Sequence, residues 1–313
     1  MLKLQKSVWP NPLPDVQIWD YARISFINTL MSKRKLQWLV DAGHVDGWTD
    51  PRFPTVQGMA RRGLQIEALR DFIVSQGASK NMTVQEWDKL WNINKRIIDP
   101  VAPRHTAIAT GNQASLPAVP YVANYQGPVV PVTILDEFAS EMVTVPKHVK
   151  NPAVGTKAQF RSRNLLLEQC DATLLSVGDE VTMMAWGNMV VEEIDKSGAD
   201  GAVMGVSMRL KLDGDVKKTK LKLTWLAADS DLVPLEVRFL GPLLNKKVPE
   251  EGDTMEQIVN TESDMRLQAV GDANMRTLQK GDVIQLERKG FFIVDQALTR
   301  GGGKMVLVDI PVK

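Results

Sequence analysis

Cysteine, histidine and long apolar runs are scarce in this sequence of 313 residues. Its one cysteine, Cys170, excludes an internal disulfide and is typical of a reducing compartment, so we expect a cytoplasmic protein in which Cys170 is a small buried apolar side chain. His44, His105 and His148 lie far apart, without metal-ligand spacing, so we predict no metal site. No stretch approaches the roughly 20 apolar residues of a membrane helix, and the amino end is too short and polar for a signal peptide.

A strong charge of either sign is also missing. The net charge is +1 with 24% charged residues, so no global basic surface indicates nucleic acid. Residues 1–110 hold 15 Lys and Arg against 10 Asp and Glu, an asymmetry compatible with phosphate contacts but weak by itself. The segment 301–304 lacks the spacing and the following helix of a P-loop, and we expect a hairpin tip there. No pair of a nucleophile and a base is evident.

The first hundred residues have helical periodicity. We expect Ser32 to cap a helix that ends at Gly43. A second helix is expected around Leu69, Phe72 and Ile73, which share one face at helical spacing.

A third helix is predicted to follow residues 83–86, which read Thr-Val-Gln-Glu and match a capping box. This helix carries Trp87 and Trp91 and ends before Pro100. We expect both tryptophans in the core rather than in a base-stacking platform.

After Pro103 the pattern changes to short strands. Residues 220–225 alternate strictly, which puts two leucines and a tryptophan on one face of a strand. Further strands are expected at residues 129–135, 141–145, 180–194, 202–212, 235–240, 283–295 and 305–312. Such a series without long helices predicts β-barrels or sandwiches. The acidic stretch 250–264 is expected to be a surface excursion.

The segment 30–36 reads Leu-Met-Ser-Lys-Arg-Lys-Leu and places two cations behind a small hydroxyl at a helix start. It resembles the mobile ATP loop of class I aminoacyl-tRNA synthetases, whose lysine stabilises the triphosphate as the adenylate forms. The resemblance implies that Met31, Ser32, Lys33 and Arg34 bind ATP and that Lys33 is catalytic. Leu30 stands where many such loops have lysine, which puts the phosphate contacts on Lys33 and Arg34. The adenine-side motif of that class, a His-Ile-Gly-His-like turn, is absent from the sequence.

Other segments extend the resemblance to the glutamyl-tRNA synthetases of the archaeal and eukaryotic type. These segments are residues 21–26, 45–58, 61–64, 86–91, 94–104, 221–225, 234–238 and 284–292. The sister glutaminyl synthetases share this architecture, and residues 54–63 favour the glutamyl branch. Because the family begins with a nucleotide-binding domain and this chain starts near the end of that domain, we expect either an expressed part or a natural fragment of such an enzyme.

The resemblance implies an α+β multidomain fold, with a helical domain followed by two antiparallel β-barrels, the second inserted in the first. It assigns residues 1–35 to the end of the catalytic domain with the ATP loop, and residues 36–103 to a helical domain that contacts tRNA. Residues 104–163 and 234–313 would form the proximal barrel, and residues 164–233 the distal barrel.

The resemblance also places Arg104, Lys147, Gln285 and Arg288 against the anticodon. A guanidinium can fork to a base edge or a phosphate, although a surface salt bridge is the alternative for Arg104. Side chains three apart on a regular strand point to opposite faces, so Gln285 and Arg288 can both touch RNA only if their strand ends or bulges there. His148 either stacks on a splayed base or is an ordinary exposed loop histidine.

These features predict the anticodon-recognising portion of a glutamate–tRNA ligase, whose parent enzyme attaches glutamate to tRNA-Glu with ATP and Mg²⁺. Without the adenine-side motif, this chain alone is expected to be inactive and to bind no cofactor. The expected partners are tRNA-Glu and, for the parent, glutamate and ATP, with a multi-synthetase assembly as a further candidate and no membrane. The alternatives are a glutaminyl-tRNA synthetase fragment, a non-catalytic β-barrel interaction module, and a β-barrel binder of carbohydrate or small ligands, which leaves residues 31–34 unexplained.

Overall fold

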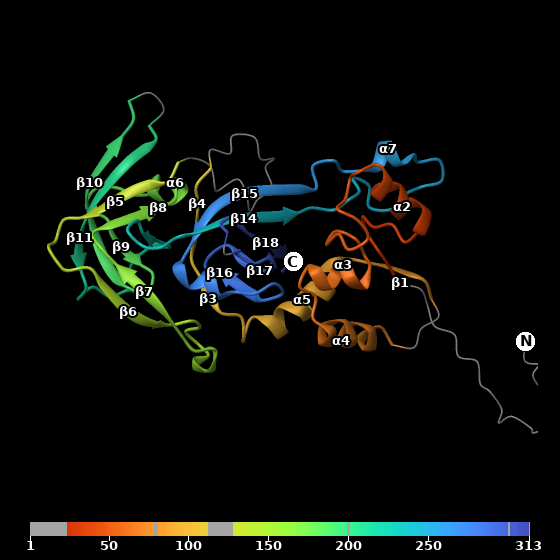
Figure 1. Cartoon of the computed structure of the whole chain (residues 1–313), viewed down its shortest axis with the longest axis horizontal. Helices are drawn as coiled ribbons and strands as arrows, with labels where there is room; N and C mark the ends of the chain where they lie inside the picture. Colours follow the sequence, from red (N-terminus) through yellow and green to blue (C-terminus); the bar gives the residue numbers. More distant parts are fainter. Residues whose placement is uncertain (1–23, 78–80, 112–127, 199–200, 300, 313) are drawn as a thin grey trace, which may run out of the picture.

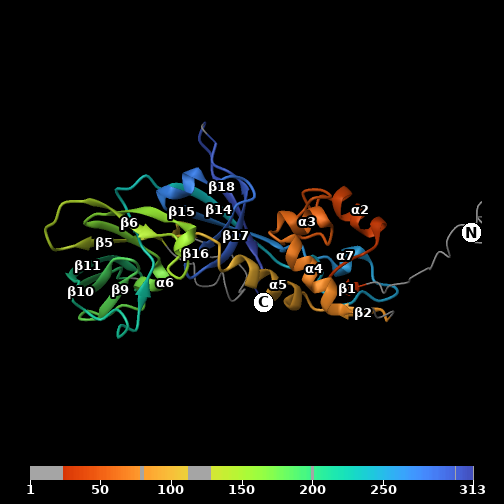
Figure 2. The same cartoon turned by 90° about the horizontal axis from the view of Figure 1, so that it is seen from below.

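The computed structural model describes residues 24–77, 81–111, 128–198, 201–299 and 301–312. Within these ranges the elements follow one long axis (Figure 1), with most of the helices at one end, a first seven-stranded sheet in the middle and a second one at the far end. The perpendicular view shows the same order (Figure 2). What the sequence predicts for residues 1–23 lies outside the described residues.

One end of the molecule, called the helical end below, contains several helices and a two-stranded parallel sheet. Its elements are β1 (Ile24–Phe26), α2 (Lys33–Asp41), α3 (Val56–Arg61), α4 (Ile66–Gln76), β2 (Thr83–Gln85) and α5 (Trp87–Ile98). Phe72, Leu90 and Trp91 are buried together, and Trp87 packs against them. The prediction that the two tryptophans belong to the core is confirmed.

Local predictions for this end are confirmed in part. Helix α2 begins after Ser32, as expected, but the Ser32 side chain makes no capping hydrogen bond. Gly43 follows the end of the helix with φ of 73°, a left-handed conformation that glycine adopts without a steric penalty. On α4, Phe72 is buried but Ile73 is 53% exposed. The buried face of this helix therefore includes Phe72 but not Ile73.

The capping box predicted at residues 83–86 is wrong. Residues 83–85 form β2, which pairs in parallel with β1, and α5 begins only at Trp87. A capping box occurs instead at α7 (Met255–Ile258), between Thr254 and Gln257. Thr83 and Glu86 have the hydroxyl, the carboxylate and the spacing of a capping box, but pairing of residues 83–85 with β1 makes this segment a strand.

The middle sheet, called the proximal sheet below, contains the first and last strands of the β region. Its order is β3 (Arg104–His105), β16 (Val283–Leu286), β17 (Gly290–Gln296), β18 (Met305–Ile310), β14 (Val233–Leu240), β15 (Asp264–Gly271) and β4 (Ala107–Ala109). Leu235, Val237 and Phe239 alternate along β14 into its core, as the two-residue period of a strand requires. A short 3-10 turn, η3 (Ala273–Thr277), follows β15.

The far sheet, called the distal sheet below, is built from residues between β4 and β14. Its order is β12 (Lys222–Leu223), β9 (Glu180–Met183), β10 (Gly187–Lys196), β11 (Val203–Lys211), β5 (Val130–Ile134), β8 (Asn164–Leu167) and β13 (Leu226–Ala227). Helix α6 (Gln169–Ala172) follows β8. A separate antiparallel ribbon, β6 (Glu141–Pro146) and β7 (Thr156–Arg161), carries the 3-10 turn η2 (Pro152–Val154).

The expected antiparallel barrels need correction, because both sheets are mixed. In the proximal sheet β14 pairs in parallel with β18, and β16 with β3, while in the distal sheet β11 pairs in parallel with β5, and β12 with β9. Hairpins give antiparallel neighbours, but strands joined by long connections can run side by side in the same direction. The fold is therefore α+β, with strongly curled mixed half-barrel sheets (Figure 1).

The expected boundary at residue 164 cuts the distal sheet, because β5 pairs with β8 and β11.

The stretch 250–264 is also more than a surface excursion. Ile258, at the end of α7, is buried in one cluster with Leu36 and Leu39 of α2. Among the described helices, none is long and apolar enough to cross a membrane.

Several predicted strands are shorter or divided. The expected strand at 180–194 is the hairpin of β9 and β10, and the one at 283–295 is the hairpin of β16 and β17. In the alternating segment 220–225, only Lys222–Leu223 forms a strand. Alternation identifies a half-buried segment but not where its backbone finds a partner.

Candidate nucleic-acid interface

Backbone pairing around strands β3 and β16 brings together three of the four residues predicted to meet an anticodon. Arg104 and Gln285 are directly paired in the parallel ladder. The Arg104 amide donates to the carbonyl of Lys147 at 2.8 Å, and the Gln285 amide donates to the carbonyl of Pro103 at 2.9 Å. Residues from three distant parts of the chain therefore meet at one edge of the proximal sheet.

The strand alternation places Gln285 on the outer face. Ile284 and Leu286 are completely buried, so Gln285 between them points away from the core. Directly paired residues of neighbouring strands share a face, and Arg104 therefore lies on the same side as Gln285.

Not every hydrogen-bond donor of the Arg104 side chain has an acceptor within the described residues. Its Nη2 lies 3.5 Å from the Asp99 carboxylate, and the side chain is 23% exposed. Its Nε is buried and has no hydrogen-bond partner among the described residues. A buried donor without an acceptor is costly, so this nitrogen requires an acceptor such as a water molecule, an ion or a ligand atom.

Arg288 lies apart from this ladder, in the turn after β16. Since β16 ends at Leu286, the condition under which Gln285 and Arg288 can both face a ligand is met. Arg288 has φ of 64°, and its two terminal nitrogens lie 2.5 and 2.8 Å from the carboxylate oxygens of Asp171. Its side chain remains 41% exposed. The hydrogen bond with Asp171 raises the pKa of Arg288, so the guanidinium stays charged.

The two readings proposed for His148, a base-stacking side chain or an exposed loop histidine, are both wrong. His148 is only 3% exposed. Its Nε2 lies 3.0 Å from the carbonyl of Asp99, and its Nδ1 accepts a hydrogen bond from the Lys150 amide. Both ring nitrogens are therefore engaged within the protein, and the imidazole joins its loop to the end of α5.

The residues predicted to bind ATP lie at the helical end of the molecule, away from this edge of the proximal sheet. Met31, Ser32, Lys33 and Arg34 are all exposed at the start of α2 (Figure 1). The first amides of a helix have no intrahelical acceptor, so this position suits a phosphate. Among the described residues, no group of three or more His, Cys, Asp and Glu side chains is placed to hold a metal ion.

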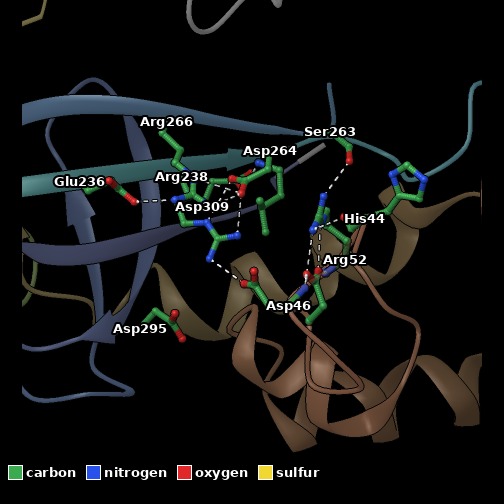
Figure 3. Close-up of polar contacts among 12 residues, drawn as sticks. His44, Asp46, Arg52, Glu236, Arg238, Ser263, Asp264, Arg266, Asp295 and Asp309 are labelled. Carbon is green, nitrogen blue, oxygen red and sulfur yellow. Dashed lines mark hydrogen bonds and ion pairs between the residues drawn. The ribbon is translucent and has the colours of Figure 1, made fainter. Parts of the chain in front are cut away.

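A buried polar network joins the helical end to the proximal sheet, and sequence reasoning missed it. Figure 3 shows Arg238 of β14 between two carboxylates, Asp264 of β15 at 2.7 Å and Asp46 of the helical end at 3.1 Å. Burial would lower the pKa of Arg238, but the hydrogen bonds and charges of Asp264 and Asp46 together outweigh burial and raise it. For Asp264, burial would raise the pKa, and the bonds from Arg238 and Arg266 lower it instead.

A second arginine of the network rigidifies the loop before α3. Arg52 bonds the fully buried Asp50 carboxylate at 2.8 Å and donates to the Ser263 hydroxyl at 2.8 Å and to the His44 carbonyl (Figure 3). The only signal in the sequence is Asp-Pro-Arg at residues 50–52, a turn pattern that does not reveal its distant partner.

Comparison with known families agrees with this geometry. Residues 11–100 match the family model for tRNA synthetases class I (E and Q), catalytic domain. Residues 119–212 and 222–295 match two models for the anti-codon binding domain of the same synthetases. The matches define the class as a class I tRNA synthetase of the E and Q group.

Curated relatives narrow the class. The chain is 47% identical over 299 residues to "Glutamate--tRNA ligase, cytoplasmic" of Arabidopsis thaliana, covering 96% of this chain and 39% of that protein. It is 42% identical to the protein of the same name from Saccharomyces cerevisiae, with the same coverage. A "Bifunctional glutamate/proline--tRNA ligase" of Mus musculus is 41% identical over 89% of this chain and 17% of its own length.

The chain belongs to the glutamate–tRNA ligase family of eukaryotic type and comprises the anticodon-binding region with the tail of the catalytic domain. It spans 39% of the length of the Arabidopsis and yeast relatives.

Proposed function

We propose that this chain binds tRNA-Glu and reads its anticodon with Arg104, Lys147, Gln285 and Arg288. The observation that carries the proposal is the shared outer face of Arg104 and Gln285. Within the described parts of the chain, the buried Nε of Arg104 has no acceptor. An unpaired base presents hydrogen-bonding edges that a guanidinium and a carboxamide can bond. The Lys147 ammonium suits a phosphate on the same strand of RNA.

The proposal extends to the parent enzyme, which would use ATP with Mg²⁺ to activate glutamate and then esterify the tRNA. In that enzyme Lys33 would offset charge on the phosphates as the adenylate forms, with Arg34 beside it and the amides near Ser32 adding donors. The supporting observation is that these side chains are exposed at a helix start. We expect this chain alone not to form glutamyl adenylate, and glutamate-dependent exchange of pyrophosphate into ATP by the chain would contradict this.

Binding of tRNA-Glu transcript, compared with the same transcript carrying a scrambled anticodon loop, tests the anticodon proposal. At moderate salt we expect the native anticodon to bind more tightly. Arg104→Ala should weaken binding of the native transcript by roughly tenfold and that of the scrambled transcript much less, because one base contact contributes about 1–3 kcal/mol. Arg209→Ala, which removes an exposed arginine from β11, is the matched control. Equal binding of both transcripts would exclude anticodon reading by this chain.

Binding of a tRNA-Gln transcript, compared with tRNA-Glu, distinguishes a glutamyl from a glutaminyl specificity. We expect tighter binding of tRNA-Glu, and a preference for tRNA-Gln would assign the chain to the sister specificity. Loss of all tRNA binding, with a folded chain, would leave the interaction-module alternative.

A further inference from the structure

We propose that Asp171 is a positioning residue for Arg288, through which the distal sheet controls how the proximal sheet reads an anticodon base. This inference rests on the anticodon-binding function proposed above. Asp171 belongs to α6, which follows a strand of the distal sheet, whereas Arg288 belongs to the β16–β17 turn of the proximal sheet. Neither residue can take its observed position unless the two sheets are docked.

The contact between them is a two-pronged ion pair. Nη1 and Nη2 of Arg288 lie 2.5 and 2.8 Å from the two carboxylate oxygens of Asp171. Such a fork fixes the plane of the guanidinium as well as its place. Asp171 is 3% exposed, whereas Arg288 keeps 41% exposure, so the carboxylate is sheltered while part of the arginine can meet a ligand.

The backbone of Arg288 depends on this pair. Its φ of 64° lies in the left-handed region, which is unfavourable for a residue with a Cβ. This conformation turns the side chain out of the alternation of β16 and toward α6. Because glycine would adopt the same turn without strain, the structure gains from an arginine here only through its side-chain contacts.

A second, fully buried ion pair holds the same two elements together. Nζ of Lys289 lies 2.7 Å from a carboxylate oxygen of Glu168, and the two side chains are 4% and 5% exposed. The other oxygen of Glu168 accepts a hydrogen bond from the amide of Ala109 in β4 at 2.8 Å. Breaking a buried pair leaves an uncompensated charge, so α6 is firmly attached to the proximal sheet. Asp171 is thereby a rigid support for the neighbouring arginine.

The fork therefore affects discrimination between bases, but not the general attraction of Arg288 to RNA phosphates. A guanidinium held in one plane can distinguish the hydrogen-bonding edges of different bases, because only one arrangement of acceptors matches its remaining donors. A mobile guanidinium still attracts phosphates, since attraction between charges depends little on orientation. Removing the Asp171 charge should therefore weaken binding of the native anticodon while leaving binding of altered anticodons nearly unchanged.

The experiment is a comparison of Asp171→Asn with the unaltered chain, using tRNA-Glu and single-base anticodon variants of it. We expect the ratio of dissociation constants between variant and native transcripts to fall about tenfold, while the constant for the variants changes less than twofold. Asp231→Asn, which removes the carboxylate of the exposed Arg276–Asp231 pair, is the matched control and should leave the ratio unchanged. Binding is measured well below the melting temperature of each protein.

The outcomes separate this inference from the function on which it rests. If the unaltered chain does not discriminate between anticodons, the proposed function fails. If it discriminates and Asp171→Asn discriminates equally well, the positioning role is overturned. Should Asp171→Asn not fold, Asp171→Glu keeps the charge but lengthens the side chain and displaces the fork. An unchanged ratio in that folded variant would overturn the inference equally.

Discussion

The guanidinium of Arg61, on α3, forms two parallel hydrogen bonds to the carboxylate of Asp295, on β17, at 2.6 and 2.7 Å. The two residues are 234 positions apart, and the pair fastens the helical end to the proximal sheet. Burial would raise the pKa of Asp295, whose side chain is 1% exposed, but the bond from Arg61 lowers it. The same hydrogen bond raises the pKa of Arg61.

Arg61→Met should lower the free energy of unfolding by about 3 kcal/mol, because it leaves the buried Asp295 carboxylate without its partner. Asp295→Asn in the same background should recover part of this loss by removing the stranded charge. Urea denaturation at pH 7 measures both effects. Arg209→Met, in an exposed pair with Glu192, should change the free energy by less than about 1 kcal/mol. Equal effects of the two arginine substitutions would contradict the role assigned to the buried pair.

Gly58→Ala should destabilise the loop before α3. A Cβ at residue 58 would lie 2.5 Å from the carbonyl oxygen of Asp50 and 2.8 Å from that of Phe53, and both are backbone atoms that cannot rotate away. We expect a loss of about 1–3 kcal/mol, the usual cost of overpacking, measured by urea denaturation. Gly198→Ala is the matched control, because nothing lies within 4 Å of its added Cβ. A neutral Gly58→Ala would mean that the loop can move away at little cost.

Asp272 should make stability depend on pH. Burial would raise the pKa of its carboxyl, but the bond from His105 and the charge of Lys157 outweigh burial and hold the pKa well below its ordinary value. A carboxyl whose pKa falls on folding stabilises the fold fully above its unfolded value of about 3.9, and this contribution is lost as pH falls through the lower folded value. Asp272→Asn should therefore cost about 2 kcal/mol at pH 7 and clearly less at pH 3.

Urea denaturation at the two pH values and constant salt tests this expectation. Asp213→Asn, which removes an exposed carboxylate of the distal sheet, should cost less than about 0.5 kcal/mol at either pH. A loss for Asp272→Asn that is the same at both pH values would show that its charge does not contribute.

Cys170 should react slowly with alkylating reagents in the folded protein. Burial, and then the charges of Glu168 and Asp171, raise the pKa of its thiol to about 11, from an ordinary value of 9.0. Because the thiolate is the nucleophile, the reactive fraction near neutral pH falls roughly a hundredfold. Mass spectrometry after iodoacetamide treatment, in buffer and in denaturing urea, measures the two rates. Equal rates would show that the thiol is as easily ionised in the folded chain as in the unfolded one.

Local patterns predicted the elements whose stability is mainly local. The extent of α2, with Ser32 before it and Gly43 after it, was readable because helix ends have specific residue preferences. The burial of Trp87 and Trp91 on α5 followed from helical spacing. Strand β14 was recognised by its alternation. The strands β2, β3 and β4, two or three residues long, were not, because such segments become strands only through a distant partner.

The candidate site was predicted unevenly for the same reason. The family resemblance named Arg104, Lys147, Gln285 and Arg288, and the β3–β16 ladder brings the first three together. It did not reveal that Arg288 is held by Asp171, which is 117 positions away. Their RNA contacts remain predictions.

By itself the sequence determined the family, the helical character of the first hundred residues and the series of short strands that follows, since motifs and periodicity depend on neighbouring residues. Tertiary structure decided which strands run in parallel, that His148 is buried and links its loop to α5, and that Asp171 pairs with Arg288. These outcomes depend on burial and on partners far along the chain. Burial strengthens an ion pair or makes an unpartnered charge costly, and a local pattern carries no record of it.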